Sequence, residues 1–427
     1  MTAVEPLSVP SPHPTGPLAG YRVLDFADEK GQLCARLLGE LGADVIKVEP
    51  REGDRTRQNG PFFRGEQGPD TSLYWWAMNA GKRSVTCELR LEPGRELAHR
   101  LVAVSDIVIE TNPPGTAAAL GLDYATLSRV NPSIIVVSIT NFGQTGPYKD
   151  WLATDIVASA MGGHMHLNGD PERGPVRTTA PQAFAQANFQ GAAGAMVALY
   201  ARGVNDGLGQ HVDVSMQEAV ANAMDNAQAT WDILHVNLSG PGVRRNNRGL
   251  MGPRYLYETK DGWVTCLQAG GLIGPGSGPI IDWLAENGEA NGLDSPEWRE
   301  KLAALVPLDP EDRQYVEDTL AAFCKKRGKL ELVAEAQRRM AGWAPVFSPR
   351  EIVESEQLAA RDYWVRVRHD DLGESFIYPG APFKLSETPW KQRGRAPRIG
   401  EHNEQVYGEL LGLDAAELRR LRMRMVI

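Results

Sequence analysis

Two histidines and an aspartate in one short segment could in principle bind a metal ion. His164, His166 and Asp170 lie close together in the sequence, and imidazole and carboxylate groups are common ligands of divalent metals. Residues at i and i+2 of a strand point to opposite faces, however, and no further His or Cys lies near this segment. We therefore predict ordinary loop histidines here and no metal site.

The glycine-rich motifs of nucleotide-binding proteins and hydrolases are also missing. After the first predicted strand the sequence reads DFADEKGQ, with one glycine where a dinucleotide-binding fold has GxGxxG. The stretch Gly274–Gly278 (GPGSG) lacks the Lys-Ser/Thr pair of a phosphate loop, so it is either a plain flexible loop or a ligand-contacting loop. No GxSxG nucleophile elbow occurs. Residue spacing alone therefore does not predict a particular reaction or cofactor for this protein.

The elements that would position a site alternate between strand and helix in the first half of the chain. Apolar strands are predicted at 21–26, 44–49, 107–110 and 133–139, with helices after Gly31, at 92–104 and at 124–130. Further on we predict a helix at 187–201 with an apolar face, a strand at 211–214 and a long helix at 215–234. This alternation predicts an α/β fold with a parallel sheet covered on both faces.

Composition shifts divide the chain into predicted parts. They are a Pro-rich disordered tail (1–17), a large domain (18–235), a Gly/Pro/Asn/Arg-rich linker (236–253), a small α+β domain (254–342) and a C-terminal segment (343–427). The small domain is predicted to begin with a hairpin whose turn is Asp261-Gly262.

Bulk properties exclude several classes of protein. A net charge of −9 argues against nucleic acid or an acidic membrane surface as the main partner. No apolar run is long enough to span a bilayer, and the N-terminus does not read as a signal peptide. Four scattered cysteines without a CxxC indicate reduced thiols. We therefore expect a cytoplasmic protein.

Several phrases together resemble the class III CoA-transferase family, which includes formyl-CoA transferases, carnitine CoA-transferases and α-methylacyl-CoA racemases. They are LAGYRVLDFADEKGQLCARLLGELGADVIKVEPREGD, NAGKRSVTCEL, ETNPPGTAAALGLDYATLSRVNPSIIVVSITNFGQTGPY, DGLGQHVDVSMQEAV, GAPFKLSETP and APRIGEHNEQVYGELLGL. The resemblance implies a Rossmann-like large domain built from both chain ends, an inserted small domain, and an interlocked-ring dimer. It also implies an aspartate nucleophile that attacks an acyl-CoA thioester, with no permanently bound cofactor and the CoA thioester as substrate.

This chain departs from the family pattern at the nucleophile. The resemblance places the aspartate just before the helix, at or beside Ala187, and no Asp or Glu occurs between Glu172 and Asp206. Asp155 is the alternative carboxylate that could reach the site. Thr154 stands where the racemases carry a histidine, so two-base racemisation lacks both of its proton-transfer groups.

The phosphate-binding residues that the resemblance implies are also replaced. The positions that carry basic residues in formyl-CoA transferase-like members match Pro50, Ala119 and Leu152. Fewer cations mean weaker charge-assisted binding of phosphate. Arg51, Arg55 and Arg57 lie nearby in the sequence and are candidates to compensate.

Three hypotheses follow from these departures. The first is a non-catalytic subunit of a heteromeric CoA-transferase, paired as heterodimer or heterotetramer with a paralogous subunit that keeps its aspartate, as implied by similarity to benzylsuccinate CoA-transferases. The second is a self-sufficient CoA-transferase or thioesterase with an altered mechanism. The third is a CoA-ester-binding or structural protein without turnover.

Overall fold

The computed structural model describes residues 16–224, 226–247, 250–266, 277–303 and 308–427. The chain separates into two compact units. Of these described residues, the first unit contains those within 16–163, 178–223 and 356–427, and the second contains those within 164–177 and 224–355. Most of the predicted N-terminal tail and of the glycine-rich stretch at 274–278 lies outside the described residues.

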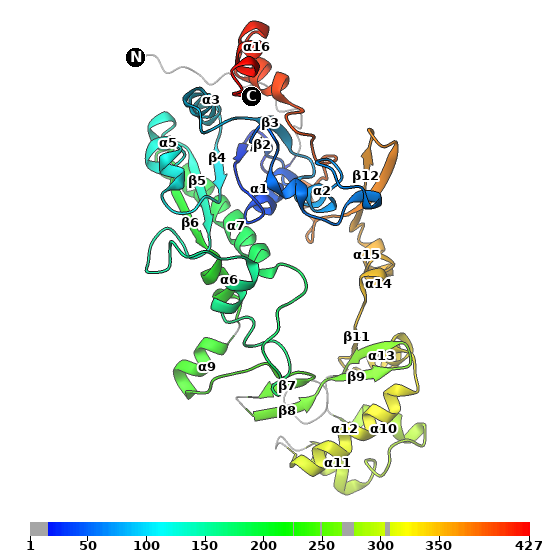
Figure 1. The fold of residues 1–427 in the computed structure, drawn as a ribbon. Coiled ribbons are helices and arrows are strands. Elements are labelled where there is room, and N and C mark those ends of the chain that lie inside the picture. The colour runs from blue at the N-terminus through cyan, green and yellow to red at the C-terminus, as the bar shows by residue number, and fades with distance from the viewer. Residues whose placement is uncertain (1–15, 225, 248–249, 267–276, 304–307) are drawn as a thin grey trace. The chain divides into compact units, whose positions relative to one another are not determined.

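A six-stranded parallel sheet forms the centre of the first unit (Figure 1), with strand order β3-β2-β1-β4-β5-β6. Its strands are β1 (Arg22–Asp25), β2 (Asp44–Glu49), β3 (Arg83–Thr86), β4 (Ile107–Glu110), β5 (Ile135–Thr140) and β6 (His211–Ser215). Each neighbouring pair is parallel. The predicted α/β class with a parallel sheet is therefore confirmed.

Helices cover both faces of this sheet, because parallel strands need crossover connections. The helices of the unit are α1 (Gln32–Glu40), η1 (Arg55–Gln58), η2 (Phe63–Gly65), α2 (Leu73–Asn79), α3 (Glu92–Ala103), α4 (Thr116–Ala119), α5 (Tyr124–Val130), α6 (Asp155–Met161), α7 (Gln182–Val204), α8 (Met216–Asn222), α15 (Glu356–Ala360), η3 (Glu404–Leu410) and α16 (Ala415–Met423). Helices α1 and α7 pack together on one face.

The opposite face carries the core that joins the two ends of the chain. Buried strand residues such as Val108 and Val136 pack there with Leu101 of α3, Tyr407 of η3 and Ile427. A separate antiparallel pair, β12 (Trp364–His369) and β13 (Glu374–Pro379), packs through its buried residues against α2. The large unit is thus built from both chain ends, as the resemblance implied.

The second unit is a smaller α+β assembly. It contains α9 (Ala227–Leu234), β7 (Arg244–Asn247), β8 (Leu250–Arg254), β9 (Leu256–Thr259), β10 (Gly262–Thr265), α10 (Gly278–Glu286), α11 (Pro296–Ala303), α12 (Pro310–Lys325), α13 (Lys329–Arg338), β11 (Ala344–Pro345) and α14 (Pro349–Val353). Strands β9 and β10 are antiparallel with Thr259 opposite Gly262, which confirms the predicted hairpin turn at Asp261-Gly262.

Two predicted helices differ from the observed ones. The helix predicted at 215–234 is wrong as one element, because α8 ends at Asn222 and α9 begins at Ala227. Asn222 and Asn226 flank the break, and asparagine side chains compete with helical backbone hydrogen bonds. The helix predicted at 187–201 begins earlier, at Gln182 directly after Pro181.

Candidate functional site

The carboxyl ends of β1 and β4 form the point where the strand order of the sheet reverses. β1 lies between β2 and β4, and the chain leaves β1 toward one side and β4 toward the other. In open α/β sheets, ligands bind in the crevice outside the carboxyl ends of the strands at such a point. The loops that follow β1, β2 and β4 are therefore the walls of the candidate site.

A cluster of buried charges lies under this edge of the sheet. Lys47 of β2 pairs with Asp54 at 3.0 Å and approaches Asp25 at 3.8 Å. Lys82 pairs with Asp25 at 2.7 Å and also donates to the Asn79 Oδ1 atom at 2.8 Å. None of these residues was among the predicted site residues, although the charged residues inside the apolar strands (YRVLDF, DVIKVE) are a signal for such a cluster.

The charges of the cluster shift one another's pKa values. Burial lowers the pKa of Lys82 to about 8, although the Asp25 carboxylate opposes the shift. Burial also opposes charge on Lys47, but Asp25 and Asp54 outweigh it and raise the pKa of that ammonium. Burial likewise disfavours an ionised Asp54, yet Lys47 and the Thr56 backbone N–H lower its pKa to about 2. The cluster is thus a mutually compensated structural network.

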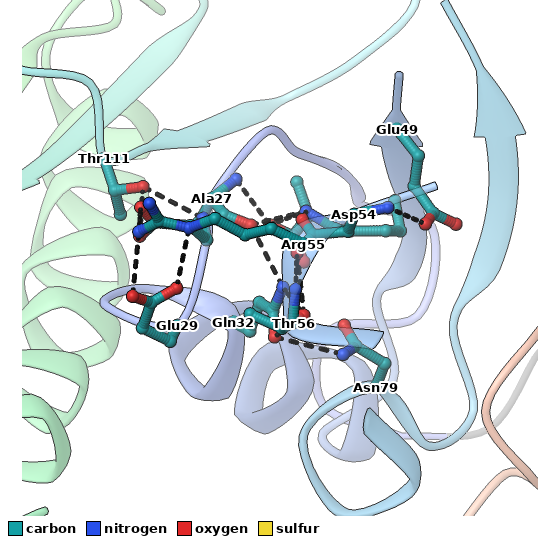
Figure 2. A network of polar contacts seen from close by, with 12 residues as sticks. Ala27, Glu29, Gln32, Glu49, Asp54, Arg55, Thr56, Asn79 and Thr111 are labelled. Atoms are coloured by element: carbon teal, nitrogen blue, oxygen red, sulfur yellow. Dashed lines mark hydrogen bonds and ion pairs between the residues drawn. The ribbon is translucent and has the colours of Figure 1, made fainter. Parts of the chain in front are cut away.

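Neutral polar side chains tie this cluster to the surrounding elements (Figure 2). The Gln32 amide of α1 donates to the Thr56 hydroxyl at 3.0 Å, and the Asn79 amide of α2 donates to Gln32 Oε1 at 3.1 Å. The Thr56 hydroxyl in turn donates to Asp54 at 2.7 Å. Helices α1 and α2 and the turn η1 are therefore held together directly beneath the crevice.

Arg57 is a structural residue in this protein. Its guanidinium makes a bidentate pair with Glu49 of β2 at 2.7 and 2.8 Å, and it lies 3.7 Å from the centroid of the Trp75 ring. It also donates to the Pro397 carbonyl at 3.0 Å. The side chain is 1% exposed. The guanidinium that was a candidate to bind phosphate is therefore already paired within its own chain.

Arg55 reaches the rim of the crevice but lies between two carboxylates. It pairs with Asp28 at 2.7 Å and with Glu29 at 2.8 Å, both in the loop that follows β1. Figure 2 shows the pair with Glu29. The Thr111 hydroxyl, from the turn after β4, donates to Asp28 Oδ1 at 2.8 Å. Lys30 also pairs with Asp28. These contacts join the loop after β1 to the turn after β4. The cations Arg55 and Lys30 are thereby already paired with carboxylates.

Arg51 and the three replaced phosphate positions lie at the surface. Arg51, Pro50 and Ala119 are exposed, and Leu152 is 92% exposed. The Arg51 guanidinium contributes to lowering the pKa of Glu88, to which the hydrogen bond from Arg90 contributes most. Of the three candidate arginines, Arg51 is therefore the one that the buried and rim networks do not engage.

Ala187 lies in the second turn of α7 and is fully buried. Gly191, one turn later, faces the Cys34 sulfur of α1, which lies 3.2 Å from where a Cβ would stand. Asn188, which directly follows Ala187, accepts a hydrogen bond from the Cys34 backbone N–H at 2.6 Å and donates one to the Lys30 carbonyl at 2.8 Å. The expectation that this position lies just before the helix is therefore wrong, because α7 begins at Gln182.

Asp155 is the first residue of α6, and it is 6% exposed. Its Oδ1 atom accepts a hydrogen bond of 3.0 Å from the Phe184 backbone N–H. Phe184 lies in the first turn of α7, whose N–H groups have no partner within the helix. Asp155 thus caps α7 from a distant position in the sequence.

Substituting Asp155 tests this capping assignment. We expect Asp155→Ala to lower the free energy of unfolding by about 1 kcal/mol, a typical value for loss of a side-chain cap. Asp155→Asn keeps an oxygen acceptor at the cap and serves as the matched control, with a smaller loss. Chemical denaturation of both variants measures the difference, and equal losses would contradict the assignment.

The histidine segment shows no grouping of metal ligands. His164 Nε2 lies 3.3 Å from the Asn168 amide. Among the residues that the structure describes, no three His, Cys, Asp or Glu side chains are placed to hold a metal ion. No helix in the described ranges is long and apolar enough to cross a membrane.

Comparisons with known proteins agree over nearly the whole chain. The family model for CoA-transferase family III matches residues 18–403. The chain is 34% identical to succinyl-CoA:(R)-benzylsuccinate CoA-transferase subunit BbsE of Thauera aromatica, over 94% of this chain and 96% of that protein. It is 32% identical to the succinyl-CoA–L-malate CoA-transferase beta subunit of Chloroflexus aurantiacus, over 97% and 98%.

A solved structure with the same fold is a CaiB/BaiF family protein from Brucella suis. The two chains are 27% identical, with a TM-score of 0.79 over 93% of this chain and all of the other. On these grounds, this chain belongs to CoA-transferase family III.

Proposed function

We propose that this chain is the non-catalytic subunit of a heteromeric class III CoA-transferase. Its assembly moves CoA between a CoA thioester, such as succinyl-CoA, and a carboxylic acid, and a paralogous subunit supplies the nucleophilic aspartate. The proposal rests on assigning the family's nucleophile position to Ala187 or its immediate neighbour, in a stretch from 173 to 205 that has no Asp or Glu; Ala187 itself is buried. Alanine has no group that attacks a thioester.

The candidate polar groups already have hydrogen-bond or ion-pair partners within this chain, which supports the proposal. Asp155, the alternative carboxylate, is buried and caps α7. Arg55 and Arg57, which were candidates to bind the phosphates of CoA, pair with carboxylates of their own chain. A ligand phosphate would have to displace those carboxylates, at a cost in existing ion pairs. We therefore assign the CoA-transfer reaction to the active site of the paralogous subunit.

The similar proteins named as subunits support a heteromer. One is called a subunit of a benzylsuccinate CoA-transferase and another the beta subunit of a malate CoA-transferase. We propose that this chain also pairs with a paralogue, as heterodimer or heterotetramer, in the cytoplasm. All four of its cysteines are free and buried, in keeping with a reducing compartment.

The outer face of α7 supports a protein partner. The residues that α7 buries are mostly small, such as Ala183, Ala187 and Gly191. Its large apolar side chains point outward instead: Phe189 is 54% exposed, Val197 67% and Tyr200 73%. Contiguous exposed apolar surface of this kind marks interaction sites. We assign this face to the paralogous subunit.

Charges placed on this face should prevent assembly. We expect the double substitution Val197→Asp and Tyr200→Asp to abolish co-purification with the partner, because two carboxylates would be desolvated in the interface. Met423→Asp is the control, since Met423 is 75% exposed on α16. Both variants should keep wild-type stability as isolated chains. A double variant that still co-purifies would contradict the assignment.

The activity test separates the three hypotheses. We expect the chain alone to show no CoA transfer from succinyl-CoA, and its co-expression with an aspartate-bearing paralogue to restore transfer. Transfer at ordinary enzyme rates by the chain alone would instead support a self-sufficient enzyme. If no transfer occurs with or without the paralogue but calorimetry detects binding of CoA, the chain is a binding protein and the proposal fails.

A further inference from the structure

Strand β3 is an edge strand of the sheet, and a segment from the C-terminal part of the chain covers its free side. The Ser84 carbonyl accepts a hydrogen bond from the His402 backbone N–H at 2.9 Å. The Tyr407 hydroxyl donates to the Thr86 carbonyl at 2.8 Å. Ser84 is 0% exposed and Thr86 5%, so their backbone groups depend on partners within the protein.

The N–H groups on this side of β3 bind side chains of the same segment. The Ser84 N–H donates to His402 Nδ1 at 3.1 Å. The Thr86 N–H donates to Asn403 Oδ1 at 2.9 Å, and the Asn403 amide donates in return to the Thr86 hydroxyl at 2.8 Å. Two neighbouring residues thus hold two strand N–H groups, one through an imidazole and one through an amide oxygen. Of these two acceptors, only the imidazole takes up a proton near neutral pH.

The hydrogen bond from Ser84 fixes the protonation state of the His402 ring. A backbone N–H can only donate, so Nδ1 is the unprotonated nitrogen. A neutral imidazole has one N–H donor and one acceptor, which places its proton on Nε2. An imidazolium carries protons on both nitrogens, and its Nδ1–H would face the Ser84 N–H. The hydrogen bond is then lost, and a buried backbone donor is left without an acceptor, which is costly.

The charged groups around His402 do not supply an unpaired carboxylate that would stabilise the imidazolium. The Asp44 carboxylate of β2 is paired with Arg83 of β3 at 2.5 Å. Glu401 is paired with Arg395 at 2.6 Å. Burial has the largest effect on the pKa of His402 and lowers it. The two carboxylates raise this pKa, and the two arginines lower it further. The surroundings therefore favour the neutral ring that the geometry requires.

We propose that His402 is an acid-sensitive latch that holds the C-terminal segment against β3. At neutral pH the unprotonated Nδ1 accepts from the Ser84 N–H, and the latch is closed. Uptake of one proton from solvent forms an Nδ1–H bond, converts the ring to an imidazolium and breaks the hydrogen bond to Ser84. Asn403 does not titrate, so its bonds to Thr86 remain, and the segment opens from the His402 end.

The latch is connected to the buried ion pair beneath the crevice. The Ser84 hydroxyl accepts from the Gly400 N–H at 3.0 Å and donates to Glu49 Oε1 at 2.5 Å. Glu49 is the bidentate partner of Arg57. Arg57 also donates to the Pro397 carbonyl, three residues before Gly400. Opening the latch therefore loosens the segment beside this ion pair.

Acid opens the latch, because the pKa of His402 is lower in the folded chain than in the unfolded chain. The folded state then binds the proton less tightly than the unfolded state does. The latch contributes its full stability above the unfolded pKa of about 6.5. This contribution is lost as the pH falls from there through the lower folded pKa. The latch is thus closed at neutral pH and opens in mild acid.

Amide hydrogen exchange of the full chain, followed residue by residue with nuclear magnetic resonance, tests the latch between about pH 7.5 and 5. After correction for intrinsic exchange rates, we expect protection of the Ser84 amide to fall about fivefold or more in acid, as for a buried donor that loses its acceptor. The Thr86 amide, whose acceptor does not titrate, should lose less protection.

Two matched substitutions separate the latch from general effects of acid. His402→Asn keeps an oxygen acceptor for Ser84, as Asn403 does for Thr86, but cannot titrate, so it should preserve Ser84 protection in acid. His99→Asn is the control. The His99 imidazole donates to the Gly121 carbonyl, and protonation does not remove a donor, so this variant should leave the acid effect at Ser84 unchanged.

Nitrogen chemical shifts of the histidine rings give a second measurement that needs no variant. At neutral pH we expect His402 to be the Nε2–H tautomer, with a titration midpoint below the ordinary value of about 6.5. An Nδ1–H tautomer would overturn the proposal. So would Ser84 protection that is indifferent to pH, or that still falls in acid in His402→Asn.

Discussion

Arg57→Met should lower the free energy of unfolding by about 3–5 kcal/mol, the usual cost of removing one partner of a buried ion pair. Glu49 would keep its charge in a site without its bidentate partner, and the stacking of the guanidinium on Trp75 would be lost as well. The bond to the Pro397 carbonyl also disappears, which leaves that carbonyl with the Trp75 Nε1–H donor at 3.1 Å. Urea denaturation of the isolated chain measures this loss.

Arg55→Met is the matched control for this substitution. It removes the same chemical group two residues away, but from a pair whose arginine is 65% exposed, so we expect a loss of about 0.2–1 kcal/mol. Adding Glu49→Gln to Arg57→Met should recover part of the stability, because the unpaired charge is then gone. If Arg57→Met is as stable as wild type but has lost affinity for CoA in calorimetry, Arg57 is a phosphate ligand and its structural assignment fails.

The three arginines illustrate what the sequence could and could not predict. Their places shortly after the second predicted strand made all three candidates to bind phosphate. Their separate roles depend on partners that are distant in the sequence, such as Pro397 for Arg57. The rim partners of Arg55, Asp28 and Glu29, come from the loop after β1. Spacing within one segment does not reveal such tertiary pairs.

The fold itself was more accessible, because apolar strands and amphipathic helices repeat with regular periods. The start of α7 was not predicted correctly, because the group that caps this helix is the Asp155 carboxylate of another helix. The orientation of α7 was not predictable either. An apolar face on a helix predicts burial, but periodicity cannot distinguish burial in the core from burial by a partner. Here small residues face α1, and Val197 and Tyr200 face outward.

Ala187→Asp should not create an active enzyme, and we expect it to destabilise the chain by about 3 kcal/mol at neutral pH, as an unpaired charge would be buried. Ala187 is 0% exposed on the face of α7 that packs against α1, and Asn188 already fixes that contact through Cys34 and Lys30. Ala193→Asp is the matched control, because Ala193 is exposed on the same helix. It carries the same helix-propensity cost, below about 0.7 kcal/mol, without the burial.

The pH dependence of this variant separates burial of charge from a loss of packing. Burial raises the pKa of an introduced carboxyl above its value in the unfolded chain, so the folded state binds the proton more tightly. The penalty is therefore largest above the folded pKa and declines as the pH falls toward the unfolded value of about 4. Denaturation at neutral and mildly acidic pH should show this decline for Ala187→Asp and not for Ala193→Asp. A stable Ala187→Asp chain that transfers CoA by itself would contradict this prediction. The absence of the aspartate alone would then explain why the wild-type chain is inactive, and the ion pairs of Arg55 and Arg57 would not contribute to that inactivity.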